Sequence, residues 1–96
     1  MPLKILGYQY TIDRGRAVVE MGTVGACTPD HLIIQIAKDI PETTAISTAL
    51  HEIVEALKWH LAIKLPHDSI RQLEAALITV LLDNGVDPSP LLGESG

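Results

Sequence analysis

Residues 45–64 contain neither glycine nor proline, and their side chains are apolar around most of a helical circumference. This pattern predicts a helix over 45–64, with Thr43 or Thr44 as its N-cap. Leu65-Pro66 ends the helix, because the residue before a proline avoids the α region.

A second helix is predicted from Pro66 or His67 to residue 82 or 83. Asn84-Gly85 follows it and is typical of a left-handed C-cap. Two helices joined by so short a turn are expected to pack antiparallel.

The first forty residues carry short apolar stretches separated by glycines, which favours strands. Residues 5–12 and 17–21 are predicted to form a hairpin with its turn at 13–16, and residues 22–29 to form a loop. Residues 31–38 are predicted as a third strand, with Leu32, Ile34 and Ile36 on one face. We expect an α+β fold, with a small antiparallel sheet of about three strands followed by an antiparallel helical hairpin.

The chain has 96 residues, 47% of them hydrophobic, and a net charge of −5. This length suits one domain over 1–96, with a β-rich part (1–40), two helices (44–84) and a tail (85–96). The negative charge argues against a nucleic-acid partner. The longest apolar runs, such as residues 75–82, are too short to span a membrane. With a single cysteine and no signal-peptide pattern at the start, we expect a cytoplasmic location.

A narrow polar stripe interrupts the first predicted helix and contains Thr48, His51, Glu52 and Glu55. His51 and Glu55 lie one turn apart, within about 40° around the axis, so both can hold one metal ion. Glu52, rotated by about 100°, can reach a water on that metal and act as general base. The same arrangement of ligands and base occurs in the H-E-x-x-H zinc helix, and this chain has glutamate at the fifth position, H-E-x-x-E.

A catalytic zinc site needs a third protein ligand, and the second helix offers two candidates. The register of an antiparallel hairpin favours Glu74, because Glu55 and Glu74 lie at similar distances from the turn. Ligand chemistry favours His67, because it restores a set of two histidines and one carboxylate, and His67 can reach the site if the first helix ends early. We place Glu74 first, with the other residue supporting the ligands from outside.

Ordinary structural roles can explain the same residues. The stripe can be a solvated helix face, Glu74 can pair with Arg71, and His67 can cap the second helix. His60 is expected to face away from the site, and Trp59 to serve packing or an interface. Cys27 and His31 do not have the spacing of a metal site, so Cys27 is expected to be a buried free thiol.

Residues 48–57, 65–70, 73–77 and 81–85 together resemble a group of small phage-encoded proteins classed as zinc metallopeptidases. These are minimal zincin-like proteins, and the resemblance covers roughly residues 33–85. It implies a short sheet leading into the zinc helix, with His51 and Glu55 as ligands and Glu52 as catalytic base. The spacing from Glu55 to Glu74 is also similar to the gluzincin pattern. A phage origin would place the protein in the host cytoplasm.

Our leading hypothesis is therefore a zinc peptidase that binds one Zn²⁺ per chain and acts on a peptide or protein substrate. Glutamate at position 55 in place of histidine adds negative charge, which keeps other divalent transition metals as candidates. Residues 31–38 are expected to lie at the sheet edge and hold the substrate, and Tyr8 or Tyr10 is a candidate for stabilising the oxyanion. The alternative is a non-catalytic metal-binding or interaction module that forms homo-oligomers through the helical hairpin.

Overall fold

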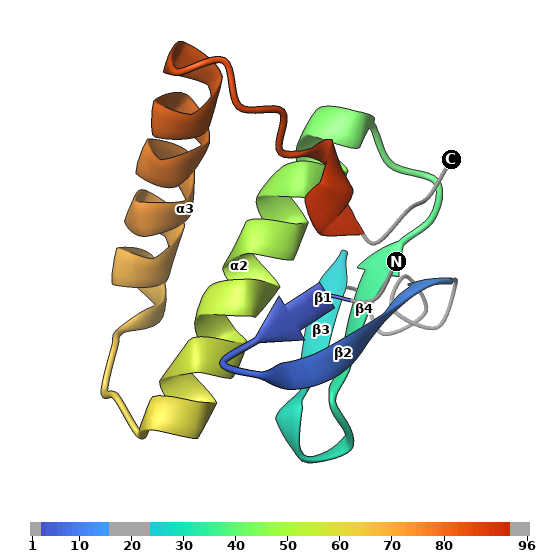
Figure 1. Cartoon of the computed structure of the whole chain (residues 1–96), viewed down its shortest axis with the longest axis vertical. Helices are drawn as coiled ribbons and strands as arrows, with labels where there is room; N and C mark the ends of the chain where they lie inside the picture. The colour runs from blue at the N-terminus through green and yellow to red at the C-terminus, as the bar shows by residue number, and fades with distance from the viewer. Residues whose placement is uncertain (1–2, 16–23, 93–96) are drawn as a thin grey trace.

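The computed structural model describes residues 3–15 and 24–92 of the chain. They form an α+β fold in which one face of a small sheet packs against a helix, and a second helix packs on the far side of the first (Figure 1). Within these residues, no helix is both long enough and apolar enough to cross a membrane. The elements are β1 (Leu3–Ile5), β2 (Tyr8–Gly15), β3 (Gly25–Thr28), β4 (Ile33–Ala37), α2 (Glu42–Leu61) and α3 (His67–Asp83), with short 3₁₀ helices η1 (Pro29–His31) and η2 (Ser89–Leu92).

The sheet has the strand order β1-β2-β4-β3 and is mixed. β1 and β3 pair antiparallel with their neighbours, whereas β2 and β4 run parallel from Thr11 opposite Ile33 to Gly15 opposite Ala37. The expectation of a wholly antiparallel sheet was therefore wrong. β1 occupies one edge of β2, and β4 joins the other edge only after the chain has left β2 and passed through β3.

The hairpin of the sheet lies earlier than predicted. β1 and β2 are joined at Leu6 and Gly7, which both have positive φ, 52° and 84°. That pair of conformations is the one that tight hairpins prefer, because its twist matches the twist of the strands. The predicted turn at Asp13–Gly15 is instead part of β2. The second predicted strand, residues 17–21, lies outside the described residues.

Two further strand assignments needed correction. Part of the predicted loop at residues 22–29 forms β3, which is an edge strand of the sheet that the described residues form. The predicted strand at 31–38 is found as β4, but it lies between β2 and β3 and not at the edge. Ile34 and Ile36 are buried on one face, as their alternation predicted.

Both helices lie close to their predicted positions, but α2 starts and ends about three residues early. Its end is a left-handed turn at Ala62, with φ of 53°, and the amide of Ile63 donates to the carbonyl of Lys58 at 3.0 Å. α3 ends as predicted, with Gly85 left-handed at φ of 70° and the amide of Val86 donating to Leu81 at 2.8 Å. In each helix this bond is the outer hydrogen bond of a Schellman C-cap.

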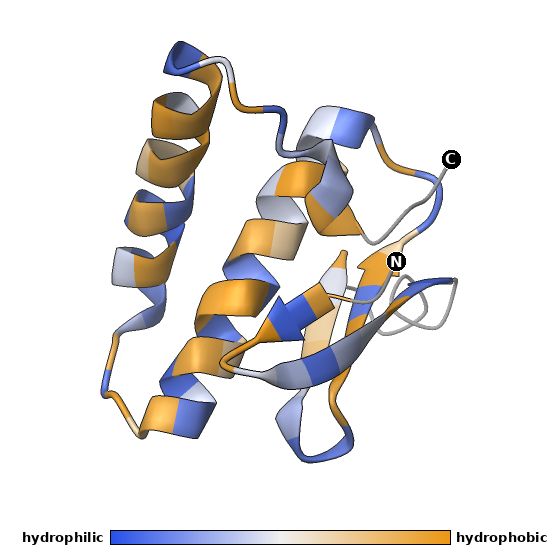
Figure 2. Ribbon diagram, in the orientation of Figure 1, coloured by the Kyte–Doolittle hydropathy of each residue, from blue (hydrophilic) through white to orange (hydrophobic). Residues whose placement is uncertain are grey.

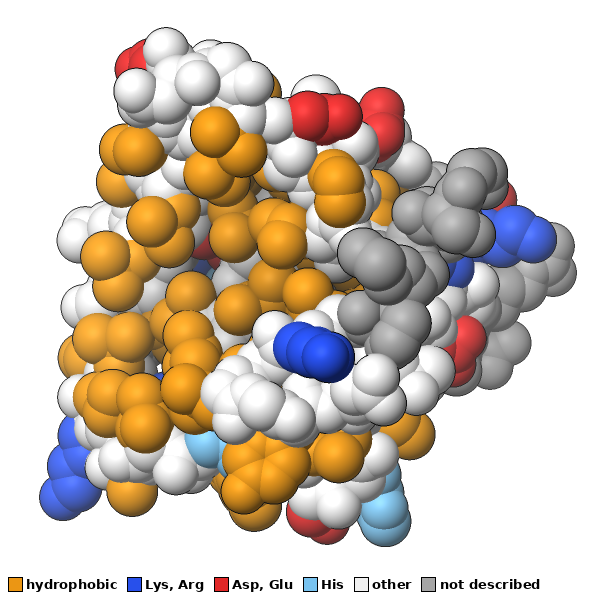
Figure 3. Space-filling model, in the orientation of Figure 1, with side chains coloured by type: hydrophobic (Ala, Val, Ile, Leu, Met, Phe, Trp, Pro, Cys, Tyr) orange, Lys and Arg blue, Asp and Glu red, His pale blue; other side chains and the backbone are white. Residues whose placement is uncertain are grey.

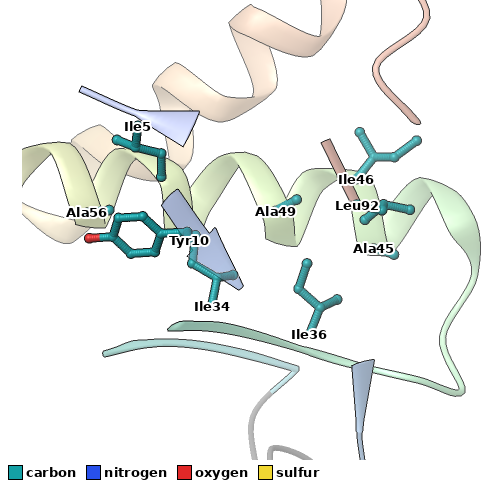
Figure 4. Close-up of a cluster of buried hydrophobic side chains, with 9 residues drawn as sticks. All are labelled: Ile5, Tyr10, Ile34, Ile36, Ala45, Ile46, Ala49, Ala56 and Leu92. Carbon is teal, nitrogen blue, oxygen red and sulfur yellow. The ribbon is translucent and has the colours of Figure 1, made fainter. Parts of the chain in front are cut away.

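The hydrophobic core lies between the sheet and α2 (Figure 4). Small side chains on α2 let the sheet approach closely, and η2 closes one end of the core. Figure 2 shows the matching orange bands on α2 and the strands, and further orange bands along α3, which stands away from the sheet. The buried residues of this cluster are Ile5, Tyr10, Ile34, Ile36, Ala45, Ile46, Ala49, Ala56 and Leu92.

Candidate metal centre

The polar stripe of α2 lies at the junction of three elements, because α2 packs against the sheet on one side and α3 on the other. Thr48 and Glu52 are both 8% exposed and face β3. A Cβ at Gly25 would lie 2.3 Å from Thr48 Cγ2 and 3.0 Å from Glu52 Oε2. Position 25 therefore needs glycine, which lets the Glu52 carboxyl lie against the backbone of β3.

Three of the predicted ligands come together across the helical hairpin. Ligand atoms of His51, Glu55 and His67 all lie within 4.8 Å of one another. His51 Nε2 is 4.0 Å from Glu55 Oε2, and the rings of His51 and His67 have centroids 4.8 Å apart. This is a set of two imidazoles and one carboxylate.

The connection between the helices explains how His67 reaches this group. α2 ends at Leu61, and residues 62–66 run back beside it, so that α3 begins level with the middle of α2 (Figure 1). An abrupt turn at Leu65-Pro66 would have left His67 near the end of the hairpin. The register argument assumed such a turn and therefore placed His67 too far from His51.

Glu74 contacts the other side of the His51 ring. Its Oε2 lies 3.0 Å from His51 Nδ1, in a contact shielded from solvent on both sides. An ionised carboxylate only accepts hydrogen bonds, so Nδ1 is the donor in this contact and Nε2 lies on the side of Glu55. A neutral imidazole held in this way has the tautomer that a metal ligand at Nε2 requires.

Two titratable groups beside this cluster have altered pKa values. Burial, with smaller contributions from the carboxylates of Glu55 and Glu74, raises the pKa of Glu52 to about 7. Burial and the negative charges of Glu52 and Glu55 raise the pKa of the Cys27 thiol to about 12. Glu52 can therefore exchange a proton near neutral pH, whereas Cys27 stays protonated and is a poor nucleophile.

A pocket of about 690 Å³ opens beside the cluster, between β3 and the C-terminal part of α2. Lys58 lies at its wall with Nζ 3.8 Å from Glu55 Oε1. Trp59 and Ile63 also line it and are about half exposed. The sequence pattern did not single out Gly25, Lys58 or Ile63, and the glycine-rich run at 22–25 was the one sign that a backbone approaches closely here.

Other predicted residues lie away from the pocket. Tyr10 is fully buried and its hydroxyl lies 2.6 Å from His60 Nε2, while the Tyr8 ring stacks on His60 at 4.5 Å. Neither tyrosine lines the pocket, so the oxyanion role suggested for them is not supported. His60 contacts both tyrosines and is not among the residues that line the pocket with His51. His31 is in η1, exposed beside Asp30.

The donor set fits a zinc ion. Zinc binds histidine nitrogen and carboxylate oxygen at about 2.0–2.2 Å in a tetrahedron, which sets ligand atoms roughly 3.4 Å apart. The three side chains would have to close by about 1 Å, which small side-chain rotations can supply. Glu74 already supports one of them from outside.

Comparisons with protein-family models, with curated protein sequences and with solved structures gave no significant match. The functional argument therefore depends on the geometry of the chain itself.

Proposed function

We propose that the protein is a zinc-dependent peptidase whose metal is held by His51, Glu55 and His67. The observation that carries this proposal is the convergence of these three side chains beside a buried carboxyl, Glu52, in one pocket. We assign His67 as the third ligand in place of Glu74, because the Glu74 carboxyl already forms a hydrogen bond with His51 Nδ1.

Each residue of the proposed site has a separate chemical role. When bound, zinc would supply a Lewis acid and a water of lowered pKa. Glu52, with a pKa of about 7, accepts a proton from the attacking water and returns it to the leaving amine. Glu74 holds His51 in its ligand tautomer, and Lys58 lies beside Glu55, where it offsets part of the negative charge of the site.

The pocket also suggests how a peptide would be held. Within the described residues, β3 is the last strand of the sheet, and it contributes Gly25, Ala26 and Cys27 to the pocket wall. An extended peptide could add to this edge by strand pairing, with main-chain hydrogen bonds holding it against the site. This assigns to β3 the substrate role that we had expected of residues 31–38.

Metal content is the first test. Elemental mass spectrometry of tag-free protein should find about one zinc per chain, lost in His51→Ala and in His67→Ala. His31→Ala is the matched control, because this exposed histidine lies outside the cluster, and it should keep its zinc. Zinc-loaded wild type that holds no metal would overturn the proposal.

Catalysis needs a second test on the zinc-loaded protein. Glu52→Gln should keep its zinc but lose about 100-fold or more of its turnover of quenched fluorescent peptides, as expected for loss of a general base. Bound zinc with no turnover of any peptide by wild type would favour the non-catalytic metal-binding module. Equal turnover by Glu52→Gln would exclude this mechanism.

A further inference from the structure

A second, smaller pocket of about 200 Å³ lies beside the metal cluster. Some residues line both this pocket and the larger one described above, so the cluster lies between the two. The shared residues are Gly25, His51, Glu52 and His67. A substrate whose reacting bond lies at the cluster would therefore extend into one pocket on each side.

The two pockets follow one another along β3. Ala26 and Cys27 line the larger pocket, whereas Val24, just before the strand, lines the smaller one. β3 already pairs antiparallel with β4, and antiparallel pairing is slightly the more stable arrangement. A peptide that adds antiparallel to the other edge of β3 runs from Cys27 toward Val24. The residue before its scissile bond then lies over the larger pocket, and the residue after that bond lies over the smaller one.

The lining of the smaller pocket is polar. Apart from Val24 and Gly25, every residue that lines it carries a polar or charged side chain. Among these described residues, Arg71 is the one lysine or arginine. A guanidinium is planar and can bind a carboxylate through two parallel hydrogen bonds. The lining therefore suits a substrate group that carries negative charge.

The Arg71 side chain is free to bind such a group. The sequence offered Glu74, three residues away, as its partner, but the Glu74 carboxyl contacts His51 Nδ1 instead. Within residues 3–15 and 24–92, the Arg71 guanidinium forms no ion pair and no hydrogen bond. Glu52 and Glu74 line the same pocket and would repel an anion there, so an anionic group could bind only beside a cation such as Arg71.

α3 presents different chemistry on two of its faces. His67, Arg71 and Glu74 are spaced four and three residues apart, which places them together on one face. On another face Leu73 and Leu77 are exposed, and Figure 3 shows hydrophobic side chains gathered over α3 and the adjoining part of α2. A charged part of a substrate is therefore expected on the first face, beside the metal cluster.

We propose that Arg71 sets the specificity of the peptidase by binding a carboxylate on the residue that follows the scissile bond. This inference rests on the zinc-peptidase function proposed above and names its substrate class. The carboxylate is either the C-terminus of the peptide, so that the protein removes the last residue, or the side chain of an aspartate or glutamate, so that it cleaves before acidic residues. The larger pocket, lined by Trp59 and Ile63, takes an apolar residue before the bond.

Peptide binding to zinc-loaded Glu52→Gln tests this specificity without turnover. The probes are acetylated tetrapeptides of apolar residues that end in alanine as the free acid, or in the amide of alanine, aspartate or lysine. By isothermal titration calorimetry, the alanine acid or the aspartate amide should bind about tenfold or more tightly than the alanine amide. The one that does so identifies the source of the carboxylate. Tightest binding by the lysine amide would overturn the inference, because the carboxyls would then dominate the pocket.

Variants at position 71 identify the group responsible. Combined with Glu52→Gln, Arg71→Gln should lose the preference, whereas Arg71→Lys should keep part of it, because lysine retains the charge but not the planar fork. Lys64→Gln is the matched control and should keep the full preference, because this exposed residue lines neither pocket. Circular dichroism and zinc content show that each variant is folded and loaded.

The failure of this inference differs from failure of the proposed function. Equal binding of acidic and neutral peptides by zinc-loaded protein would overturn the role of Arg71 and leave the zinc site in place. A preference that survives Arg71→Gln would also overturn it, because the carboxylate would then be held by the metal. Absence of zinc, or of binding by every peptide, would instead remove the proposed function, and this inference with it.

Discussion

The buried carboxyl of Glu52 makes the stability of the metal-free protein depend on pH. Its pKa is about 7 in the folded chain, against an ordinary value of 4.5. Its stabilising proton is fully bound below pH 4.5 and is lost as the pH rises through 7. Relative to Glu52→Gln, we expect the free energy of unfolding to fall by about 2–3 kcal/mol between pH 5 and pH 8. Urea unfolding in EDTA measures this fall. Parallel pH profiles of the free energy of unfolding for the two proteins would contradict the prediction.

Glu74 provides a second test at the scale of single residues. If it orients His51 from outside, Glu74→Ala should weaken zinc binding about 10- to 100-fold without changing the stoichiometry. Competition with a chelating dye measures this affinity, and Gln72→Ala, an exposed neighbour on α3, is the control. If Glu74→Ala abolishes zinc binding while His67→Ala retains it, then Glu74 is the third ligand.

The sequence singled out His51, Glu55 and His67, which the structure brings together, but it could not settle how they are arranged. Spacing on one helix is fixed by helix geometry, so His51, Glu52 and Glu55 could be grouped in advance. The position of His67 depends on the path of residues 62–66, which local propensity does not determine. The raised pKa of Glu52 comes mainly from its burial and partly from the carboxylates of Glu55 and Glu74, and both the burial and the position of Glu74 depend on segments distant in sequence.

At the scale of elements, the C-terminal turn of α2 is strained because an alanine, Ala62, occupies a left-handed position that favours glycine. Ala62 is left-handed, a conformation that costs residues with a Cβ roughly 1 kcal/mol and costs glycine little. Ala62→Gly should therefore raise the free energy of unfolding by about 0.5–1 kcal/mol. Ala75→Gly, inside α3, should lower it by about 1 kcal/mol. Thermal or urea unfolding measures both, and destabilisation by Ala62→Gly would contradict the argument.

The helices were easier to predict than the strands for a physical reason. A long run without glycine or proline, closed by Leu65-Pro66 and Asn84-Gly85, marks helices through local effects alone. Strand pairing depends on distant partners. Asp13–Gly15 carries turn residues but continues β2 because β4 pairs with it, while the actual turn uses Leu6 and Gly7. Tertiary pairing overrode local preference at both places.

At the scale of the whole molecule, α3 is attached mainly through α2, where Glu74 contacts His51. Its one fully buried side chain is Ile70, and it stands apart from the sheet (Figure 1). Zinc held by His51 and Glu55 of α2 and by His67 of α3 would tie the two helices together. Zinc that binds only to the folded hairpin stabilises it by RT ln(1 + [Zn]/Kd), which is about 4 kcal/mol when the free zinc concentration is 1,000 times Kd.

We therefore expect zinc to slow hydrogen exchange most strongly in α3. In EDTA the amides of α3 should exchange faster than those of α2, because few apolar contacts hold α3 in place. Added zinc should slow α3 at least tenfold and change the sheet much less, and His67→Ala should remove this effect while leaving exchange in the sheet unchanged. Exchange that slows equally in all elements would indicate that zinc stabilises the domain as one cooperative unit. A metal that leaves α3 as labile as in EDTA would show that α3 does not contribute a ligand.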